Sequence, residues 1–256
     1  MQPSTDEFVR EAAQTMAVLE AFSPVFPELG IKEIAQRASL PPDVVRGLAV
    51  TLCELGYLRF EAASGRYRLG AKLVGIARSF LGARGVRAAA HGHMEAMVAR
   101  LRAPLALSER DGLEMMYLDY VRGDAPVLVQ HRVGTRLPIA TSASGRAWLA
   151  SAPAVEVDAV ARQLAARSVH GGTPLEEHRA RAQHDLQTLG FTRSYGDLNP
   201  EVNAVAVPLH SPIDGLLMTF SVTSPAMLVP ARRCDAELGP ALVQMVADVV
   251  RDLTAG

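Results

Sequence analysis

The order of local patterns in the first 70 residues restricts the fold more than any other feature of the chain. Apolar residues recur at helical spacing in three segments, at about 9–19, 31–38 and 42–55. Two short segments, 57–60 and 66–69, then alternate with period two around an Ala-Ala-Ser-Gly turn, which predicts a hairpin. Three helices followed by a two-stranded wing predict a winged helix-turn-helix, a fold that binds DNA.

The residues between these segments agree with that order. Ser4–Glu7 has the pattern of a capping box ahead of the first helix. The segment from Pro24 to Gly30 is rich in proline and ends in glycine, so it predicts a loop. Gly56 is suited to end the third helix.

The third helix and the hairpin each predict one buried and one exposed face. On the helix, Val45, Ala49 and Leu52 share the buried stripe, which leaves Asp43, Arg46 and Gly47 opposite. In the hairpin, an inner face of Leu58, Phe60, Tyr67 and Leu69 places Arg59, Arg66 and Arg68 on the outer face. We expect the outer arginines to contact phosphates and the helix to face base edges.

Local charge supports this interpretation, although the whole chain has a net charge of −1. Residues 1–56 carry four basic and eight acidic side chains, whereas residues 57–84 carry six basic and one acidic. A solvated hairpin with scattered arginines is the alternative, and the three helices ahead of it favour DNA. The predicted DNA contacts are Lys32, Pro42, Asp43, Arg46, Gly47, Arg59, Arg66 and Arg68.

The rest of the chain predicts an α+β domain with a mostly antiparallel sheet. Helices are expected at about 70–85, 86–101, 173–189 and 232–253, the third of them beginning with Thr173 as cap and Pro174 as first residue. Strands are expected at 105–109, 114–121, 127–132, 203–210 and 216–223. The domains are therefore 1–70 for DNA binding, 71–85 as a linker helix, and 86–256 for sensing.

Alternation along 216–223 indicates where a ligand could bind. Thr219, Ser221 and Thr223 share one face, and hydroxyl groups in a row can hydrogen-bond a small polar molecule. The alternative is that this face meets solvent, and the sequence by itself favours that alternative. Arg132, Arg136 and Arg146 could counter a carboxylate, although such arginines usually face water.

The chain lacks the sequence motifs of several classes of protein. The chain has no GxGxxG, Walker, HExxH or GxSxG pattern, so catalysis is not expected. It has two cysteines, Cys53 and Cys234, and no CxxC pair, and His91 and His93 would point apart on a helix, so no metal or other cofactor is expected. The acidic N-terminus resembles no signal peptide and no long apolar run occurs, which predicts a cytoplasmic protein without membrane contact.

Several motifs, in order and at the expected spacing, resemble the IclR family of bacterial transcriptional regulators. They cover nearly the whole chain: 31–38 (IKEIAQRA), Leu40-Pro41, 51–58 (TLCELGYL), 65–70 (GRYRLG), 132–138, 141–147, 204–208 and 221–225. The resemblance implies a GAF-like effector domain, a homodimer or homotetramer on a palindromic operator, and an effector that is a small organic or aromatic acid. It assigns effector contacts to Met115, Leu137, Thr141, Ser142, Ala143, Asp197, Ala204, Ser221 and Thr223.

The recognition helix departs from the family pattern. The family usually has Ser-Thr near the start of this helix and an arginine four residues after the serine. Here those positions are Asp43, Val44 and Gly47, with an arginine one place earlier at Arg46. An aspartate repels phosphates, although it can accept from a cytosine amino group. The departure leaves a second hypothesis open, a sensor that dimerises and binds ligand but has lost sequence-specific DNA binding.

Overall fold

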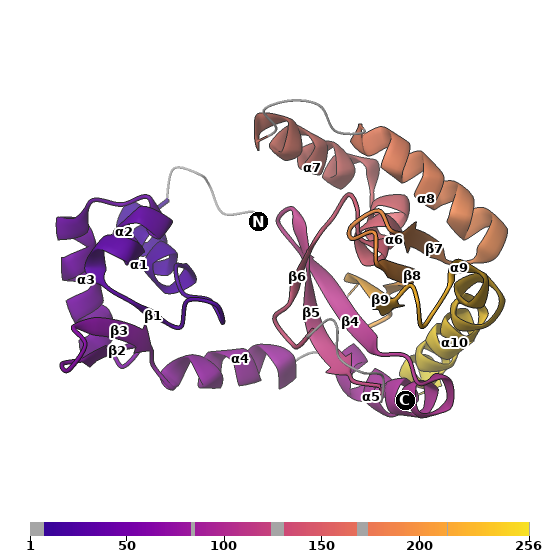
Figure 1. Ribbon diagram of the computed structural model, residues 1–256, viewed down its shortest axis with the longest axis horizontal. Coiled ribbons are helices and arrows are strands. Elements are labelled where there is room, and N and C mark those ends of the chain that lie inside the picture. The colour runs from indigo at the N-terminus through magenta and orange to yellow at the C-terminus, as the bar shows by residue number, and fades with distance from the viewer. Residues whose placement is uncertain (1–7, 83–84, 124–130, 168–173, 214, 256) are drawn as a thin grey trace. The chain divides into compact units, whose positions relative to one another are not determined.

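The chain folds into two compact units, Met1–Ala83 and Arg84–Gly256, which we call the N-terminal and C-terminal units. The structure is a computed structural model that describes residues 8–82, 85–123, 131–167, 174–213 and 215–255 (Figure 1).

The N-terminal unit has the predicted order of helices and hairpin. Its elements are α1 (Arg10–Glu20), β1 (Glu28–Leu29), α2 (Ile31–Ala38), α3 (Pro42–Glu54), β2 (Leu58–Glu61), β3 (Arg66–Leu69) and α4 (Lys72–Gly82). Pro42 is the first residue of α3, where a missing N–H leaves no acceptor unsatisfied. Gly56 follows α3 with a φ of 78°, a left-handed conformation that glycine adopts without strain.

One apolar cluster joins the three helices and the sheet of this unit. Val18 of α1, Ile34 of α2 and Val45 and Ala49 of α3 are fully buried in it. Burial of a large aliphatic side chain contributes about 1.5–3 kcal/mol. Because α3 turns this stripe inward, its opposite face is exposed, as predicted.

Three features of this unit differ from the prediction or lie beyond it. Phe60 and Leu69 were expected on the inner face of the hairpin with Leu58, but they are 50% and 45% exposed, and Leu58 alone of these three is buried in the cluster. The segment 24–30 is not only a loop, because Glu28–Leu29 forms β1 and pairs antiparallel with β3, giving the sheet order β1-β3-β2. A two-residue strand is too short to show a periodicity. The structure begins α1 at Arg10, after Val9, and the capping box predicted at Ser4–Glu7 lies outside the described residues.

The C-terminal unit contains a six-stranded sheet in the order β6-β5-β4-β9-β8-β7, and every neighbouring pair is antiparallel. The strands are β4 (Leu105–Asp111), β5 (Glu114–Val121), β6 (Arg136–Pro138), β7 (Thr192–Tyr195), β8 (Val202–His210) and β9 (Leu217–Pro225). The helices are α5 (Gly85–Leu101), α6 (Ala143–Ser151), α7 (Ala154–Arg167), α8 (Leu175–Leu189), α9 (Ala231–Arg233) and α10 (Gly239–Ala255).

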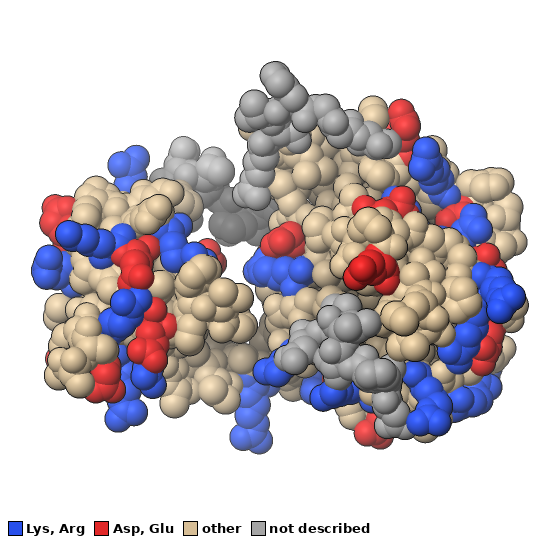
Figure 2. All heavy atoms as spheres, viewed as in Figure 1, with Lys and Arg blue, Asp and Glu red and all other residues tan. Residues whose placement is uncertain are grey.

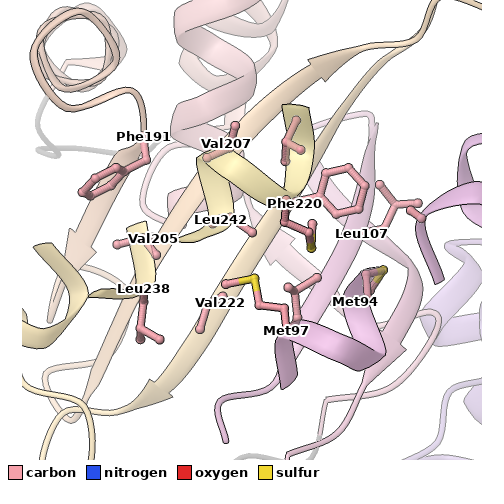
Figure 3. Close-up of a cluster of buried hydrophobic side chains, with 14 of the residues drawn as sticks. Met94, Met97, Leu107, Phe191, Val205, Val207, Phe220, Val222, Leu238 and Leu242 are labelled. Carbon is pink, nitrogen blue, oxygen red and sulfur yellow. The ribbon is translucent and has the colours of Figure 1, made fainter. Parts of the chain in front are cut away.

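The main core lies between one face of this sheet and helices α5 and α10. Figure 3 shows Met94 and Met97 of α5 pointing toward Phe220 and Val222 of β9, with Leu242 of α10 beside them. Phe220 has no exposed surface. The predicted alternation along β9 is confirmed, because its apolar residues enter this core.

The opposite face of the sheet is also covered, so the solvent alternative for the hydroxyl row is wrong. Helix α6 packs on β8 and β9 there, with Ala143 and Ala147 against Ala204 and Ala206. The side chains of Thr219 and Ser221 on this face are 0% and 2% exposed. A covered polar face needs hydrogen-bond partners for its hydroxyl groups, and the cavity described below lies on this face.

Other boundaries are corrected by the structure. The predicted last helix is interrupted by a π-helical segment, Cys234–Leu238; Gly239 follows it, and a Cβ there would lie 2.3 Å from the Phe191 ring. Pro174 precedes α8 rather than beginning it, and Thr173 lies outside the described residues. The predicted strand 127–132 lies mostly outside them too, and its last two residues are not in a strand. Strands β6 and β7 were not predicted, because three or four residues carry little periodicity.

Candidate functional site

The exposed face of α3 carries the residues that the sequence assigns to DNA. Pro42, Asp43, Arg46 and Gly47 are all exposed, and Lys32 is exposed in the first turn of α2. A side chain added at Gly47 would meet no atom within 4 Å, so the fold does not require glycine there. The small residue leaves room for close approach of a partner surface to the helix.

The outer face of the hairpin carries the three predicted arginines together with acidic partners. The register sets Arg59 opposite Arg68, and Glu61 opposite Arg66. Strand β1 adds Glu28 opposite Arg68. Lys and Arg are interspersed with Asp and Glu on the face of this unit that Figure 2 shows.

Two of these arginines are held in ion pairs. Arg66 Nη2 lies 2.6 Å from Glu33 Oε2, and Arg68 Nη2 lies 2.5 Å from Glu28 Oε1. The backbone N–H of Gly30 donates to the same Glu33 oxygen at 2.7 Å. This backbone bond, and then the bond from Arg66, lowers the pKa of Glu33 from its usual 4.5. Glu33 therefore remains charged at neutral pH.

The C-terminal unit contains a cavity of about 180 Å³ between the sheet and α6. It is smaller than the roughly 300–1,000 Å³ of pockets for drug-sized ligands, so it suits a small molecule. Its described lining consists of His131, Leu137, Ser142, Ala143, Ser144, Ser194, Leu198, Asn199, Val202, Ala204, Ser221 and Thr223.

The hydroxyl groups of the cavity differ in whether the fold already occupies them. Ser142 Oγ donates to Pro138 O at 2.7 Å and accepts from the Gly145 N–H at 3.1 Å. Ser194 Oγ donates to Thr141 O at 2.8 Å. Ser221 Oγ, by contrast, is buried and has no hydrogen-bond partner among the described residues. A buried hydroxyl without a partner costs about 1–3 kcal/mol, which a bound ligand could offset.

Tyr117 lies behind this wall and has the same property. Its ring is 1% exposed. Burial raises the pKa of its phenol above 10, although the neighbouring hydroxyls of Thr223 and Ser221 act in the opposite direction. Despite that proximity, the Tyr117 oxygen makes no hydrogen bond of good geometry to any described residue. Two unsatisfied hydroxyls therefore adjoin one wall of the cavity.

The N-terminus of α6 forms another wall. Ser142 is its capping residue, and Ser142, Ala143 and Ser144 line the cavity. The start of a helix offers free N–H groups and a partial positive charge, which attract anions. Gly145 holds this terminus in place, because a Cβ there would lie 2.1 Å from Ile139 O. The preceding turn can therefore pack directly against the helix.

No Lys, Arg, Asp or Glu occurs among the described residues that line the cavity. His131 is the one titratable group among them, and burial lowers its pKa below 6.5, so it is neutral at physiological pH. Its ring packs 5.4 Å from that of Tyr117, measured between centroids. An anion here would be held by helix N–H groups and hydroxyls rather than by a cation.

The three arginines considered as carboxylate partners do not line the cavity. Arg146 does not face water but is buried, and it donates to Arg193 O at 2.8 Å and to Asp197 Oδ2 at 3.0 Å. Arg136 pairs with Glu114 at 3.1 Å and with Asp111. Arg132 donates its backbone N–H to Thr135.

The cavity brings together six of the nine predicted effector residues: Leu137, Ser142, Ala143, Ala204, Ser221 and Thr223. Met115 instead packs in the cluster around Trp148. Thr141 supplies its carbonyl to Ser194, and Asp197 binds Arg146. The lining residues that sequence reasoning missed are His131, Ser144, Ser194, Leu198, Asn199 and Val202. Ser194 pairs with Ala204 across β7 and β8, so recognition of β7 as a strand would have found it.

The two histidines of α5 each lie beside a carboxylate. His91 Nδ1 lies 2.8 Å from Asp119 Oδ2, and His93 Nε2 lies 2.8 Å from Asp252 Oδ2. Within the described parts of the chain, no group of three or more His, Cys, Asp or Glu side chains could hold a metal ion. No described helix is long and apolar enough to cross a membrane.

Two family models match the chain over its two units. The IclR helix-turn-helix domain matches residues 12–62, and the bacterial transcriptional regulator IclR C-terminal domain matches residues 78–254. The chain belongs to the IclR family of bacterial transcriptional regulators. It is therefore a DNA-binding regulator and not an enzyme.

Individual IclR-family members agree over nearly the whole chain. A regulator structure from Brucella abortus is 31% identical, with a TM-score of 0.85 over 97% of this chain and 94% of the relative. The HTH-type transcriptional regulator TsaQ1/TsaQ2 of Comamonas testosteroni is 27% identical over 100% of this chain and 92% of its own length. An IclR homologue from Microbacterium hydrocarbonoxydans, complexed with 4-hydroxybenzoate, is 24% identical, with a TM-score of 0.76 over 96% and 100% of the two chains.

Proposed function

We propose that this IclR-family protein is a ligand-responsive regulator whose C-terminal cavity binds a small carboxylic acid and whose N-terminal unit binds operator DNA as a symmetric oligomer. The observation that carries the sensor half is Ser221 Oγ, a buried hydroxyl that lines the cavity and has no hydrogen bond of good geometry to any residue that the structure describes. Natural proteins rarely leave such a group unsatisfied, so a ligand atom is its expected partner.

The chemistry of the cavity supports an acid as the effector. The start of α6 attracts a carboxylate, and its cap at Ser142 lines the cavity. Leu137 and Val202 supply apolar walls. The homologue that binds 4-hydroxybenzoate makes small aromatic acids a reasonable first class to test.

A thermal-shift screen tests this half of the proposal. Purified protein is heated with 4-hydroxybenzoate, benzoate, pyruvate and other small acids, because a ligand that binds the folded state raises Tm. We expect a hit whose Kd is weakened at least 10-fold by Ser221→Ala, a loss of one hydrogen bond to a charged or polar ligand atom. Thr188→Ala, on the exposed part of α8, is the matched control. No Tm shift with any small acid would contradict the proposal.

The exposed apolar surface of α4 supports assembly through this helix. Val74 and Ile76 are 69% and 55% exposed within one chain, and no residue of α4 is buried. We propose that α4, within the linker 71–85, joins the domains 1–70 and 86–256 and pairs with a second copy. A two-fold dimer reads a palindromic operator. Val74→Glu should reduce the mass found by light scattering, whereas Ser79→Glu is the control on the same helix.

Coupling between the two units gives the regulator its response. If effector binding changes operator affinity by some factor, the operator must change effector affinity by the same factor. Equal effector Kd with and without operator would contradict this coupling.

The second hypothesis, a sensor without sequence-specific DNA binding, is favoured by Asp43 on the exposed face of α3 and by the balanced charge of the wing. A gel shift with the region upstream of the gene separates the two hypotheses. Operator binding that weakens with salt and with Arg59→Ala supports the regulator.

A further inference from the structure

The positive and negative charges on the outer face of the wing are equal in number, although the sequence around the wing is basic. Antiparallel pairing places Glu28, Arg68 and Arg59 in one row across β1, β3 and β2. Glu61 and Arg66 form the neighbouring row. Together with Glu33, three carboxylates therefore accompany the three arginines.

Two of the three arginines are engaged by carboxylates from outside the hairpin. Arg66 is held twice, by Glu33 Oε2 at 2.6 Å and by Glu28 O at 3.1 Å. Arg68 is held by Glu28 Oε1 at 2.5 Å. Arg59, by contrast, has no ion pair among the described residues and is exposed.

A second hydrogen bond, from the backbone of Gly30, also holds the Glu33 side chain in the position where it contacts Arg66. Glu33 Oε2 caps the start of α2 by accepting from the Gly30 N–H at 2.7 Å. Strand β1, which ends one residue before Gly30, carries Glu28 beside Arg68. The short turn into α2 therefore delivers both carboxylates to the wing.

A DNA phosphate must compete with these carboxylates. Each arginine that turns to a phosphate leaves a carboxylate close to the same DNA strand, and like charges repel. Exposed ion pairs are individually weak, so a phosphate can displace a carboxylate from its arginine. The displaced carboxylate stays nearby, so the net attraction between the wing and DNA is small. In a plot of log binding constant against log salt concentration, each phosphate that the protein contacts adds about 0.9 to the steepness of the slope. We expect the wild-type wing to contact few phosphates, so its contribution to the slope should be small.

We propose that Glu28 and Glu33 compete with DNA phosphates for Arg68 and Arg66 within the same chain. Their ion pairs leave Arg59 as the wing arginine available for DNA. This inference rests on the proposed DNA-binding function. It assigns the two carboxylates a role in limiting non-specific, charge-driven affinity, so that contacts of α3 with base edges determine a larger share of operator choice.

The experiment compares the salt dependence of DNA binding for the full-length protein and a Glu28→Gln, Glu33→Gln double variant. Binding is measured by fluorescence anisotropy with a duplex of the upstream region and with a mixed-sequence duplex. Glutamine at 33 can still accept from the Gly30 N–H, so the helix cap is retained. A Glu11→Gln, Glu20→Gln double variant is the control, because it makes the same change of two in net charge at exposed residues of α1 that have no ion pair among those the structure describes.

We expect the Glu28→Gln, Glu33→Gln variant to bind both duplexes more tightly and to steepen the log–log slope by about 2, because two more arginines engage phosphates. Its advantage over the wild type should be about 10-fold larger at ~50 mM than at ~200 mM salt. A four-residue variant that adds Arg66→Gln and Arg68→Gln should return to the wild-type slope.

The outcomes separate this inference from the proposed function. If the wild type binds DNA and the Glu28→Gln, Glu33→Gln variant has the same slope, or no steeper a slope than the Glu11→Gln, Glu20→Gln control, the competitor role is wrong and the regulator proposal stands. A steeper slope that persists in the four-residue variant also refutes the competitor role, because the arginines are then not its cause. If neither the wild type nor any variant binds either duplex, the DNA-binding proposal fails and this inference fails with it.

Discussion

Replacement of Arg146 by methionine should destabilise the C-terminal unit strongly and disturb the effector cavity. The Arg146 side chain is 6% exposed. Its guanidinium donates to Arg193 O at 2.8 Å and to Ala140 O at 3.4 Å, and it lies 3.3 Å from His178 Nδ1. Methionine keeps the apolar stem but none of the donors.

The size of the effect follows from the groups left behind. A buried acceptor that loses its donor lowers the free energy of unfolding by about 1–3 kcal/mol. The acceptors that lose a donor here are mainly the carbonyl oxygens of Arg193 and Ala140. The Asp197 side chain is 35% exposed, so water can rehydrate it and its ion pair contributes little. We expect a loss of about 3 kcal/mol in the free energy of unfolding, or about 6–12 °C in Tm for a domain of this size.

Trp148 makes the measurement specific to the C-terminal unit. It is the one tryptophan of the chain, lies on α6 and is 2% exposed. Urea unfolding followed by tryptophan fluorescence therefore reports on the unit that contains Arg146. The same variant should weaken effector binding, because Arg146 ties α6 to the loop at Asp197 that precedes the cavity residues Leu198 and Asn199.

Arg136→Met is the matched control. Arg136 is 45% exposed and pairs with two exposed carboxylates, so its loss should change the free energy of unfolding by at most about 1 kcal/mol. Equal urea midpoints for the Arg146 and Arg136 variants would refute the reasoning that Arg146 is a buried structural clamp.

Three further predictions concern single side chains. Tyr117→Phe should leave the ligand-free Tm unchanged or higher, because it removes a buried hydroxyl that makes no hydrogen bond of good geometry within the described parts of the chain. A drop of several degrees would show that the hydroxyl bonds to its neighbours Thr223 or Ser221. Burial, and then the charges of Arg146 and Arg181, lower the pKa of His178 below 6.5. As pH falls, His178 therefore takes up a proton in the unfolded chain before it does so in the folded chain, and the free energy of unfolding should decline below about pH 6.5 in the wild type and less in His178→Gln. Identical pH profiles of the two proteins would contradict this. Burial raises the pKa of the Cys234 thiol to about 11, so a thiol reagent at pH 8 should modify Cys234 only after unfolding, and labelling in the folded protein would contradict its burial.

Regular, repeated patterns made much of the fold predictable. The helical spacing in α3 and the alternation in β9 extend over enough residues for the buried face to be identified from the sequence. Short elements were missed for the converse reason. Strands β1, β6 and β7 have two to four residues, too few for alternation to differ from chance.

The candidate cavity was only partly predictable. Residues that the family resemblance assigned, such as Ser221 and Thr223, do line it. Met115 was expected as a wall, yet its side chain packs beside Trp148 instead. His131 and Asn199 line the cavity from irregular segments, where no periodicity indicates the direction of a side chain.

The sequence by itself determined the order of helices and strands, the inward stripe of α3 and the two faces of β9, because each depends on residues that are neighbours along the chain. Only the tertiary structure decided the charge of the wing. Counted along the chain, residues 57–84 are strongly basic, yet Glu28 and Glu33 fold back onto Arg68 and Arg66. Electrostatic attraction depends on distance in space, and the pairing of β1 with β3 brings together charges that lie 33 to 40 positions apart.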